Sequence, residues 1–352
     1  MTAAELRACV GRLLCVGIPA PHLDAATRLT LEQLQVGGVI LFRRNVGTPE
    51  DVAALSGALH ALPSRPLVSI DHEGGRVQRL GEPFTHFPAA AVIGRTGSAD
   101  LAYRVGHAMA TELGSVGIDL SFAPVLDVNS NPANPVIGDR AFGADPALVR
   151  AMGVAQLRGL RDGGVLPCGK HFPGHGDTAQ DSHLELPVVR RTRAQLERTE
   201  LVPFRAAIAA GLPLLMTAHV LYPALDAEHP ATLSRAILTN VLRGELGFAG
   251  VVVSDDLEMR AITDHQSIGA AAVATLAAGA DWLLVCQDLT KAVQARDAIE
   301  SAVASGALAA ESVRLASERI ERLRDAPRAV AASRLPNAAH RALVDEISLA
   351  AA

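Results

Sequence analysis

Eight short apolar runs recur along the chain, and longer Ala- and Leu-rich segments with a helical period separate them. Because the runs lack alternating polar residues, they are typical of strands buried on both faces, as in a parallel sheet. Strands that alternate with helices imply right-handed crossover connections. The runs are Leu14–Ile18, Gly38–Phe42, Leu67–Asp71, Leu120–Val125, Val165–Lys170, Leu214–Ala218, Val251–Ser254 and Trp282–Val285.

Eight strand–helix units predict an α/β fold, a single-domain (β/α)8 TIM barrel. The alternative is an open doubly wound sheet, but no GxGxxG follows an early strand. We expect residues 1–330 to form the barrel and residues 331–352 to form a helical tail packed on its outside. The expected helices are His22–Gln35, Pro49–Leu62, Asp100–Val116, Pro146–Asp162, Arg193–Ala210, Arg235–Leu246 and Gln266–Ala278, with further helical segments between Lys291 and Arg324.

Charge and hydropathy argue against several other classes of protein. The formal net charge of −5 and the lack of a basic run argue against nucleic-acid binding. The longest apolar region, Gly269–Val285, is interrupted by Gly279 and Asp281 and falls short of a membrane span. The N-terminal residues lack the basic-then-apolar layout of a signal peptide. We therefore expect a soluble, cytoplasmic monomer without nucleic-acid or membrane partners.

The stretch from Lys170 to Pro187, KHFPGHGDTAQDSHLELP, carries most of the titratable side chains near one predicted strand end. Pro173 and the glycines that follow it disfavour a helix, so we expect a loop where a barrel places its active site. Asp181 stands two residues before His183 and can orient its imidazole, which makes His183 a candidate proton donor and acceptor. The same pattern also fits a surface histidine beside a turn aspartate.

Two other strand ends carry candidate binding or catalytic groups. In VVVSDDLEM, Asp255 directly follows an apolar run and is expected to face a substrate, whereas Asp256 would point elsewhere and cap a helix. Both aspartates could instead be helix caps. In IDHEGGRVQRL, a turn at two glycines brings Arg76 and Arg79 near Asp71, which suits sugar hydroxyls but also fits a structural ion-pair cluster.

A zinc site deserves consideration because His171, His175, Asp181 and His183 are suitable ligand types. The spacing of the first two histidines matches that in HExxH, but Pro173 breaks the helix that this motif needs. We therefore expect no metal.

Taken together, four stretches resemble family 3 glycoside hydrolases: KHFPGHGDTAQDSHLELP, VVVSDDLEM, IDHEGGRVQRL and NPVIGDRAFG. Within that family the chain is most similar to the bacterial β-N-acetylglucosaminidases of peptidoglycan recycling. The resemblance covers nearly the whole chain, and KHFPGHG followed by DSH is its most specific part.

The resemblance implies that Asp255 is the nucleophile, that His183 is the general acid/base and that Asp181 is its dyad partner. It implies no metal or organic cofactor. It also implies a set of residues that bind N-acetylglucosamine: Asp71, Arg79, Arg140, Lys170 and His171, with His219 lining the same pocket.

The expected activity is that of a retaining exo-β-N-acetylglucosaminidase acting through a covalent glycosyl-enzyme. Its expected partner is a small carbohydrate, a muropeptide that ends in N-acetylglucosamine. The sequence leaves two alternatives open: a phosphorylase that uses phosphate in place of water, and a sugar-binding barrel without catalysis.

Overall fold

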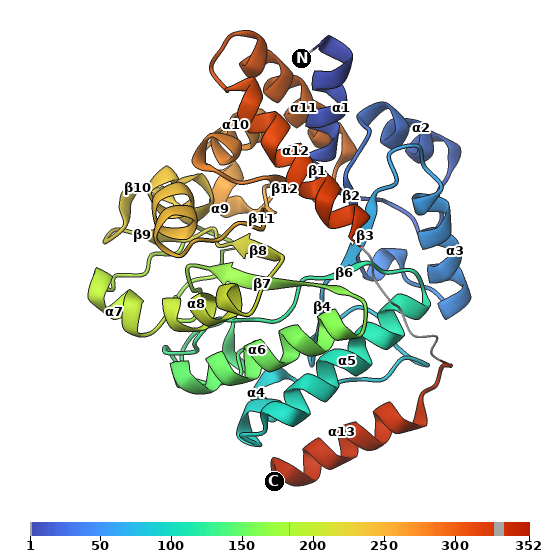
Figure 1. Ribbon diagram of the computed structural model, residues 1–352, viewed down its shortest axis with the longest axis vertical. Coiled ribbons are helices and arrows are strands. Elements are labelled where there is room, and N and C mark those ends of the chain that lie inside the picture. Colours follow the sequence, from blue (N-terminus) through green and yellow to red (C-terminus); the bar gives the residue numbers. More distant parts are fainter. Residues whose placement is uncertain (1, 183, 327–333) are drawn as a thin grey trace.

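The eight expected strands form a closed parallel barrel in the computed structural model, which describes residues 2–182, 184–326 and 334–352. Each strand pairs with the next barrel strand in the chain, and the last pairs with the first, so that Leu14 lies opposite Leu283 (Figure 1). The TIM-barrel prediction is confirmed. The barrel strands are β1 Leu14–Gly17, β2 Gly38–Leu41, β3 Leu67–Ile70, β6 Leu120–Ser121, β7 Leu166–Phe172, β8 Leu214–Thr217, β11 Val251–Asp256 and β12 Trp282–Val285.

Helices surround the barrel, and local capping sets where many of them begin (Figure 1). At α3, the Thr48 side chain accepts from the backbone of Asp51, whose carboxylate accepts in turn from the backbone of Thr48. Pro49 follows at the first helical position, where its missing N–H costs no hydrogen bond. The main helices are α1 Ala3–Arg12, α2 Ala25–Leu34, α3 Pro49–His60, α5 Ala99–Ser115, α6 Pro146–Asp162, α7 Arg193–Arg198, α8 Leu201–Ala209, the π-helix Ala236–Glu245, α10 Ile268–Ala278, α11 Leu289–Ala304 and α12 Ala310–Asp325, with short α4 Ala90–Arg95 and α9 Arg260–Thr263.

Several expected boundaries shift by a few residues, and three of the differences lie at or near a proline. The expected helix 193–210 is divided into α7 and α8, and Pro203 lies in the first turn of α8, where its missing N–H is tolerated. The expected strand 120–125 ends before Pro124. The expected loop from Lys170 begins only at Pro173, because β7 continues through Phe172.

Helix α13, Ala338–Ala350, lies along α5 at the end of the described chain (Figure 1). Leu343 and Ile347 are buried beneath it. His340, in the first turn of α13, also contacts α5: its Nδ1 lies 2.7 Å from an oxygen of the buried Glu112. Among the residues that the structure describes, no helix is both long and apolar enough to cross a bilayer.

Candidate active site

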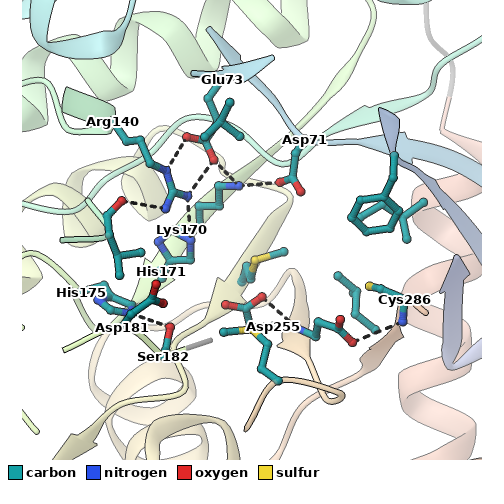
Figure 2. A pocket seen from close by; sticks show the side chains of 18 of the residues that line it. Asp71, Glu73, Arg140, Lys170, His171, His175, Asp181, Ser182, Asp255 and Cys286 are labelled. Carbon is teal, nitrogen blue, oxygen red and sulfur yellow. Dashed lines mark hydrogen bonds and ion pairs between the residues drawn. The ribbon is translucent and has the colours of Figure 1, made fainter. Parts of the chain in front are cut away.

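A cavity of about 290 Å³ opens at the carboxyl ends of the barrel strands (Figure 2). Its volume is at the lower end of pockets that hold small ligands, roughly 300–1,000 Å³. Six strands or the residues just after them supply its lining, and most of the polar side chains predicted from the sequence are among them. The predicted residues that line it are Asp71, Arg79, Arg140, Lys170, His171, Asp181 and Asp255.

One side of the cavity is a network of ion pairs around Lys170, whose side chain is only 3% exposed. Its Nζ lies 2.7 Å from Asp71 Oδ1 and 2.6 Å from Glu73 Oε1. Arg140 donates two hydrogen bonds of 2.9 Å to the Glu73 carboxylate, and Arg79 lies 3.4 Å from Asp71. Figure 2 shows this cluster across the cavity from Asp255. The buried Glu73 and the partly buried Asp71 are thus held by three cations.

The pairing keeps these groups charged despite their burial. Burial by itself raises the pKa of Glu73, but Arg140 and Lys170 outweigh it and hold this pKa well below its usual range. Asp71 behaves in the same way, since Lys170 and Arg79 overcome the effect of burial and lower its pKa. Burial lowers the pKa of Lys170, yet the two carboxylates raise it overall. The network therefore offers both hydrogen-bond donors and acceptors to a ligand near neutral pH.

A tight hairpin places Glu73 and Arg79 in this network. Strands β4 His72–Gly74 and β5 Val77–Gln78 pair through a turn at Gly74 and Gly75, whose φ values are 96° and 55°. A Cβ at Gly74 would lie 2.6 Å from the Pro88 carbonyl oxygen, so both backbone conformation and space require glycine there.

Asp127, at the end of the β6 segment, supports the floor of the cavity. Its carboxylate is fully buried and accepts a hydrogen bond from the backbone N–H of His171 at 3.1 Å and from that of His175 at 2.7 Å. The second oxygen lies 2.7 Å from His171 Nδ1. Burial raises the pKa of Asp127, but His171 and the hydrogen bonds lower it overall. An ionised Asp127 therefore orients the imidazole that faces the cavity.

The two aspartates of β11 both reach the cavity, against the expectation that Asp256 points away. Asp255 Oδ1 accepts from the Asp256 N–H at 2.8 Å. Asp256 Oδ1 accepts from the backbone of Glu258 and of Cys286, so it ties β11 to the end of β12 and caps no regular helix. Burial, and then the nearby Glu258 and Asp255, raise the pKa of Asp256 to about 7.

The loop after β7 brings Asp181 and Ser182 to the same cavity (Figure 2). His183, the predicted acid/base, lies outside the described residues. Asp181 and Asp255 therefore line one cavity from two separate elements, a loop and a barrel strand. A loop carboxylate next to a strand carboxylate and an ion-pair network is the arrangement of a polar binding site that can also transfer protons.

Comparison with known proteins identifies the family. The family model described as "Glycosyl hydrolase family 3 N terminal domain" matches residues 5–323 of the chain. The chain belongs to glycoside hydrolase family 3. A β-hexosaminidase of Thiobacillus denitrificans is 47% identical over 280 residues, which cover 78% of this chain and 77% of that protein. With several such relatives, the chain is a glycoside hydrolase of the β-N-acetylhexosaminidase type.

Two solved structures show how closely this family 3 barrel is shared. A family 3 β-N-acetylglucosaminidase from Paenibacillus superimposes with a TM-score of 0.95 at 41% identity, over 100% of this chain and 69% of that one. NagZ from Neisseria gonorrhoeae, solved in complex with N-trifluoroacetyl-D-glucosamine, gives a TM-score of 0.79 at 34% identity, over 97% and 98% of the two chains.

The resemblance implied that His219 lines the cavity. In the structure of this glycosidase, His219 is not among the residues that line it. Its Nδ1 lies 2.8 Å from Thr232 Oγ1, and its Nε2 lies 2.9 Å from the carbonyl oxygen of Asp256. His219 therefore supports the peptide that follows the predicted nucleophile Asp255 and lies one layer behind the cavity wall.

The sequence reasoning did not select Glu73, Asp127 and His175 as site residues of the glycosidase. Glu73 and Asp127 both stand at strand ends, which is a detectable signal. Their partners come from distant segments, since Glu73 pairs with Arg140 and Asp127 with His171. His175 had been considered only as a zinc ligand. Its imidazole instead contacts two hydroxyl groups, Thr178 and Ser182.

Proposed function

We propose that this glycosidase is a retaining exo-β-N-acetylglucosaminidase that removes terminal N-acetylglucosamine from peptidoglycan-derived muropeptides. The observation that carries the proposal is that Asp255 and Asp181 line one cavity beside the charged network around Lys170. The complex of the Neisseria NagZ with an N-acylated glucosamine supports the class of sugar. The muropeptide as substrate rests on the resemblance of the KHFPGHG and DSH pattern to recycling enzymes.

The proposed reaction has two steps that use the same pair of residues. In the first, a carboxylate oxygen of Asp255 attacks the anomeric carbon while the leaving oxygen takes a proton from His183. In the second, water gives a proton to His183 and its oxygen to the anomeric carbon, which releases the sugar and frees Asp255. Asp181 orients the imidazole and stabilises its protonated form. The role of His183 rests on the resemblance and on the place of Asp181 at the cavity.

The cavity walls suit one neutral sugar. Carboxylate oxygens of Asp71 accept hydrogen bonds from sugar hydroxyls, and Lys170 and Arg140 donate them. Because each charge of this network is already paired with an opposite charge, a neutral ligand needs no counter-charge of its own. Phe42 and Met216 also line the cavity and can pack against the C–H faces of a sugar ring.

Trapping the covalent intermediate tests the proposal directly. A fluorinated N-acetylglucosamine analogue should label the peptide that contains Asp255, and Asp255→Ala should lose both labelling and turnover of an aryl N-acetylglucosaminide. Asp264→Ala, which removes an exposed aspartate beyond the end of α9, is the matched control and should keep both. Turnover by Asp255→Ala at the parent rate would overturn the proposal, and release of sugar 1-phosphate in phosphate buffer would replace hydrolysis by phosphorolysis.

A further inference from the structure

The loop after β7 is folded back on itself by one buried imidazole. His175 is 1% exposed, and its Nε2 lies 3.0 Å from the hydroxyl of Ser182, which is 2% exposed. Its Nδ1 lies 3.0 Å from the Thr178 hydroxyl. Both ring nitrogens therefore contact hydroxyls of the same loop, and Ser182 stands directly between Asp181 and His183 in the sequence.

His175 is itself held from the barrel side. Its backbone N–H donates to Asp127 at 2.7 Å, and its carbonyl oxygen accepts from Asn134 Nδ2 at 2.8 Å. Asp127 also binds His171, whose ring contacts the ring of His175 edge-on at 5.7 Å between centroids. The first part of the loop, with His175, is thus bonded to Asp127 and Asn134, whereas Ser182 lies in its later part.

The charge state of His175 fits a fixed contact. Burial, and then the neighbouring His171, lower the pKa of His175 to about 4, so the imidazole is neutral near pH 7. A neutral imidazole has one donor and one acceptor nitrogen. The Thr178 hydroxyl donates to the His175 carbonyl oxygen at 3.2 Å, so it accepts from Nδ1–H, and Nε2 is left to accept from the Ser182 hydroxyl.

We propose that His175 is a positioning residue for the acid/base segment, and that its hydrogen bond to Ser182 holds Asp181 at the cavity. This inference rests on the proposed roles of Asp181 and His183. Without the bond, the loop should sample positions in which the proton donor misses the leaving oxygen. Such misplacement slows only steps that need proton transfer, because the sugar is still bound by the network around Lys170.

The test compares leaving groups in Ser182→Ala and His175→Gln. Both variants should lower kcat/KM about tenfold or more for a substrate with a poor leaving group, such as an alkyl N-acetylglucosaminide, which must be protonated. For a dinitrophenyl N-acetylglucosaminide, which needs little protonation, kcat/KM should change by less than about threefold. Ser56→Ala removes a buried hydroxyl from α3, far from the loop in the barrel wall, and should leave both values unchanged.

Equal losses of kcat/KM for both substrates would assign His175 and Ser182 a purely structural role and overturn the inference. Parent values of kcat/KM for both substrates would also overturn it. If His175→Gln fails to fold, Ser182→Ala decides alone, since it only shortens a loop side chain. His183→Ala, measured in parallel, separates the two proposals. A normal His183→Ala enzyme would overturn the proposed function, whereas a defective one beside a normal Ser182→Ala enzyme would overturn only the positioning role.

Discussion

The Asp127 carboxylate lies 2.7 Å from Nδ1 of His171 and thereby fixes the proton on that nitrogen. The Nε2 of the same ring is left as an acceptor, and Arg140 lies 3.3 Å from it with a donor. The tautomer of the imidazole at the cavity is therefore set from both sides. Asp127, which does not line the cavity, therefore determines which nitrogen of His171 carries the proton.

Asp127→Asn tests this relationship. The introduced amide group would either place its own N–H against Nδ1–H of His171 or force the proton onto Nε2. In the second case Arg140 would face an N–H of the imidazole. We expect kcat/KM to fall by about 10–100-fold. The matched control is Asp119→Asn, which alters an Asp–His pair of similar length, 2.8 Å to His60, at the opposite end of the β6 strand. That variant should keep its kinetics, and equal losses in both would show that the tautomer is not the cause.

Lys170→Met should destabilise the fold as well as weaken sugar binding. The substitution leaves the buried Glu73 and the partly buried Asp71 with fewer cations, and we expect the free energy of unfolding to fall by about 3–5 kcal/mol. Lys291→Met is the control, since Lys291 is 40% exposed and pairs with Glu258 on the rim; its cost should stay below about 1 kcal/mol. Urea unfolding of the two variants measures the difference, and similar losses would contradict the account.

The raised pKa of Glu200 predicts that the protein becomes less stable as the pH rises. Burial raises the pKa of this carboxyl to about 7, against the opposing effect of Arg191. The folded state therefore binds the proton more tightly than the unfolded chain does. The resulting stability is complete below the ordinary glutamate pKa of about 4.3 and is lost as the pH rises through the folded value.

Glu200→Gln should remove this dependence. We expect it to raise the free energy of unfolding by about 1–2 kcal/mol at pH 8 and to change it little at pH 4. Denaturant titrations at both pH values measure the effect, with Glu197→Gln on the exposed face of α7 as the control. A Glu200→Gln protein that is less stable than the parent at pH 8 would show that the pair with Arg191 outweighs burial.

Gly176→Ala should destabilise the protein, whereas Gly57→Ala should stabilise it. A Cβ at Gly176 would lie 1.7 Å from the carbonyl oxygen of Val128, so the loop after β7 must shift, whereas a Cβ at Gly57 meets nothing within 4 Å. Gly57 lies inside α3, where alanine should stabilise by about 0.5–1 kcal/mol. Thermal unfolding and kcat/KM together measure the pair, and an active Gly176→Ala enzyme would show that the loop tolerates the shift.

The barrel could be predicted from the sequence because eight apolar runs alternate with segments of helical period, and strands buried on both faces show no polar alternation. Pro203 and Pro124 are signals in the sequence for the two breaks that the expected elements missed, since a proline is tolerated in the first turn of a helix but not in its interior and removes a hydrogen bond from a strand. The loop is expected from Lys170 because Pro173 and the glycines after it disfavour regular structure, yet Lys170 and His171 lie in β7. They do so here because Asp71, Glu73 and Asp127 pair with them.

The predicted site residues, His219 included, come from the resemblance and in part from strand-end positions, and those that the structure describes line the cavity except His219. What the sequence could not supply was pairing across the fold. Nothing in the pattern of residues near Asp127 shows that its carboxylate meets His171 or the backbone of His175, because those contacts exist only after the strands close.

The pairing of β1 with β12, with Leu14 opposite Leu283, has a consequence for biosynthesis. The chain is synthesised from its N-terminus, so β1 is made before the other barrel strands but cannot pair with β12 until all of the strands between them have been translated. Each partly synthesised molecule thus exposes two unpaired strand edges and has no complete catalytic mouth. Hydrolytic competence should accordingly appear late and abruptly during synthesis.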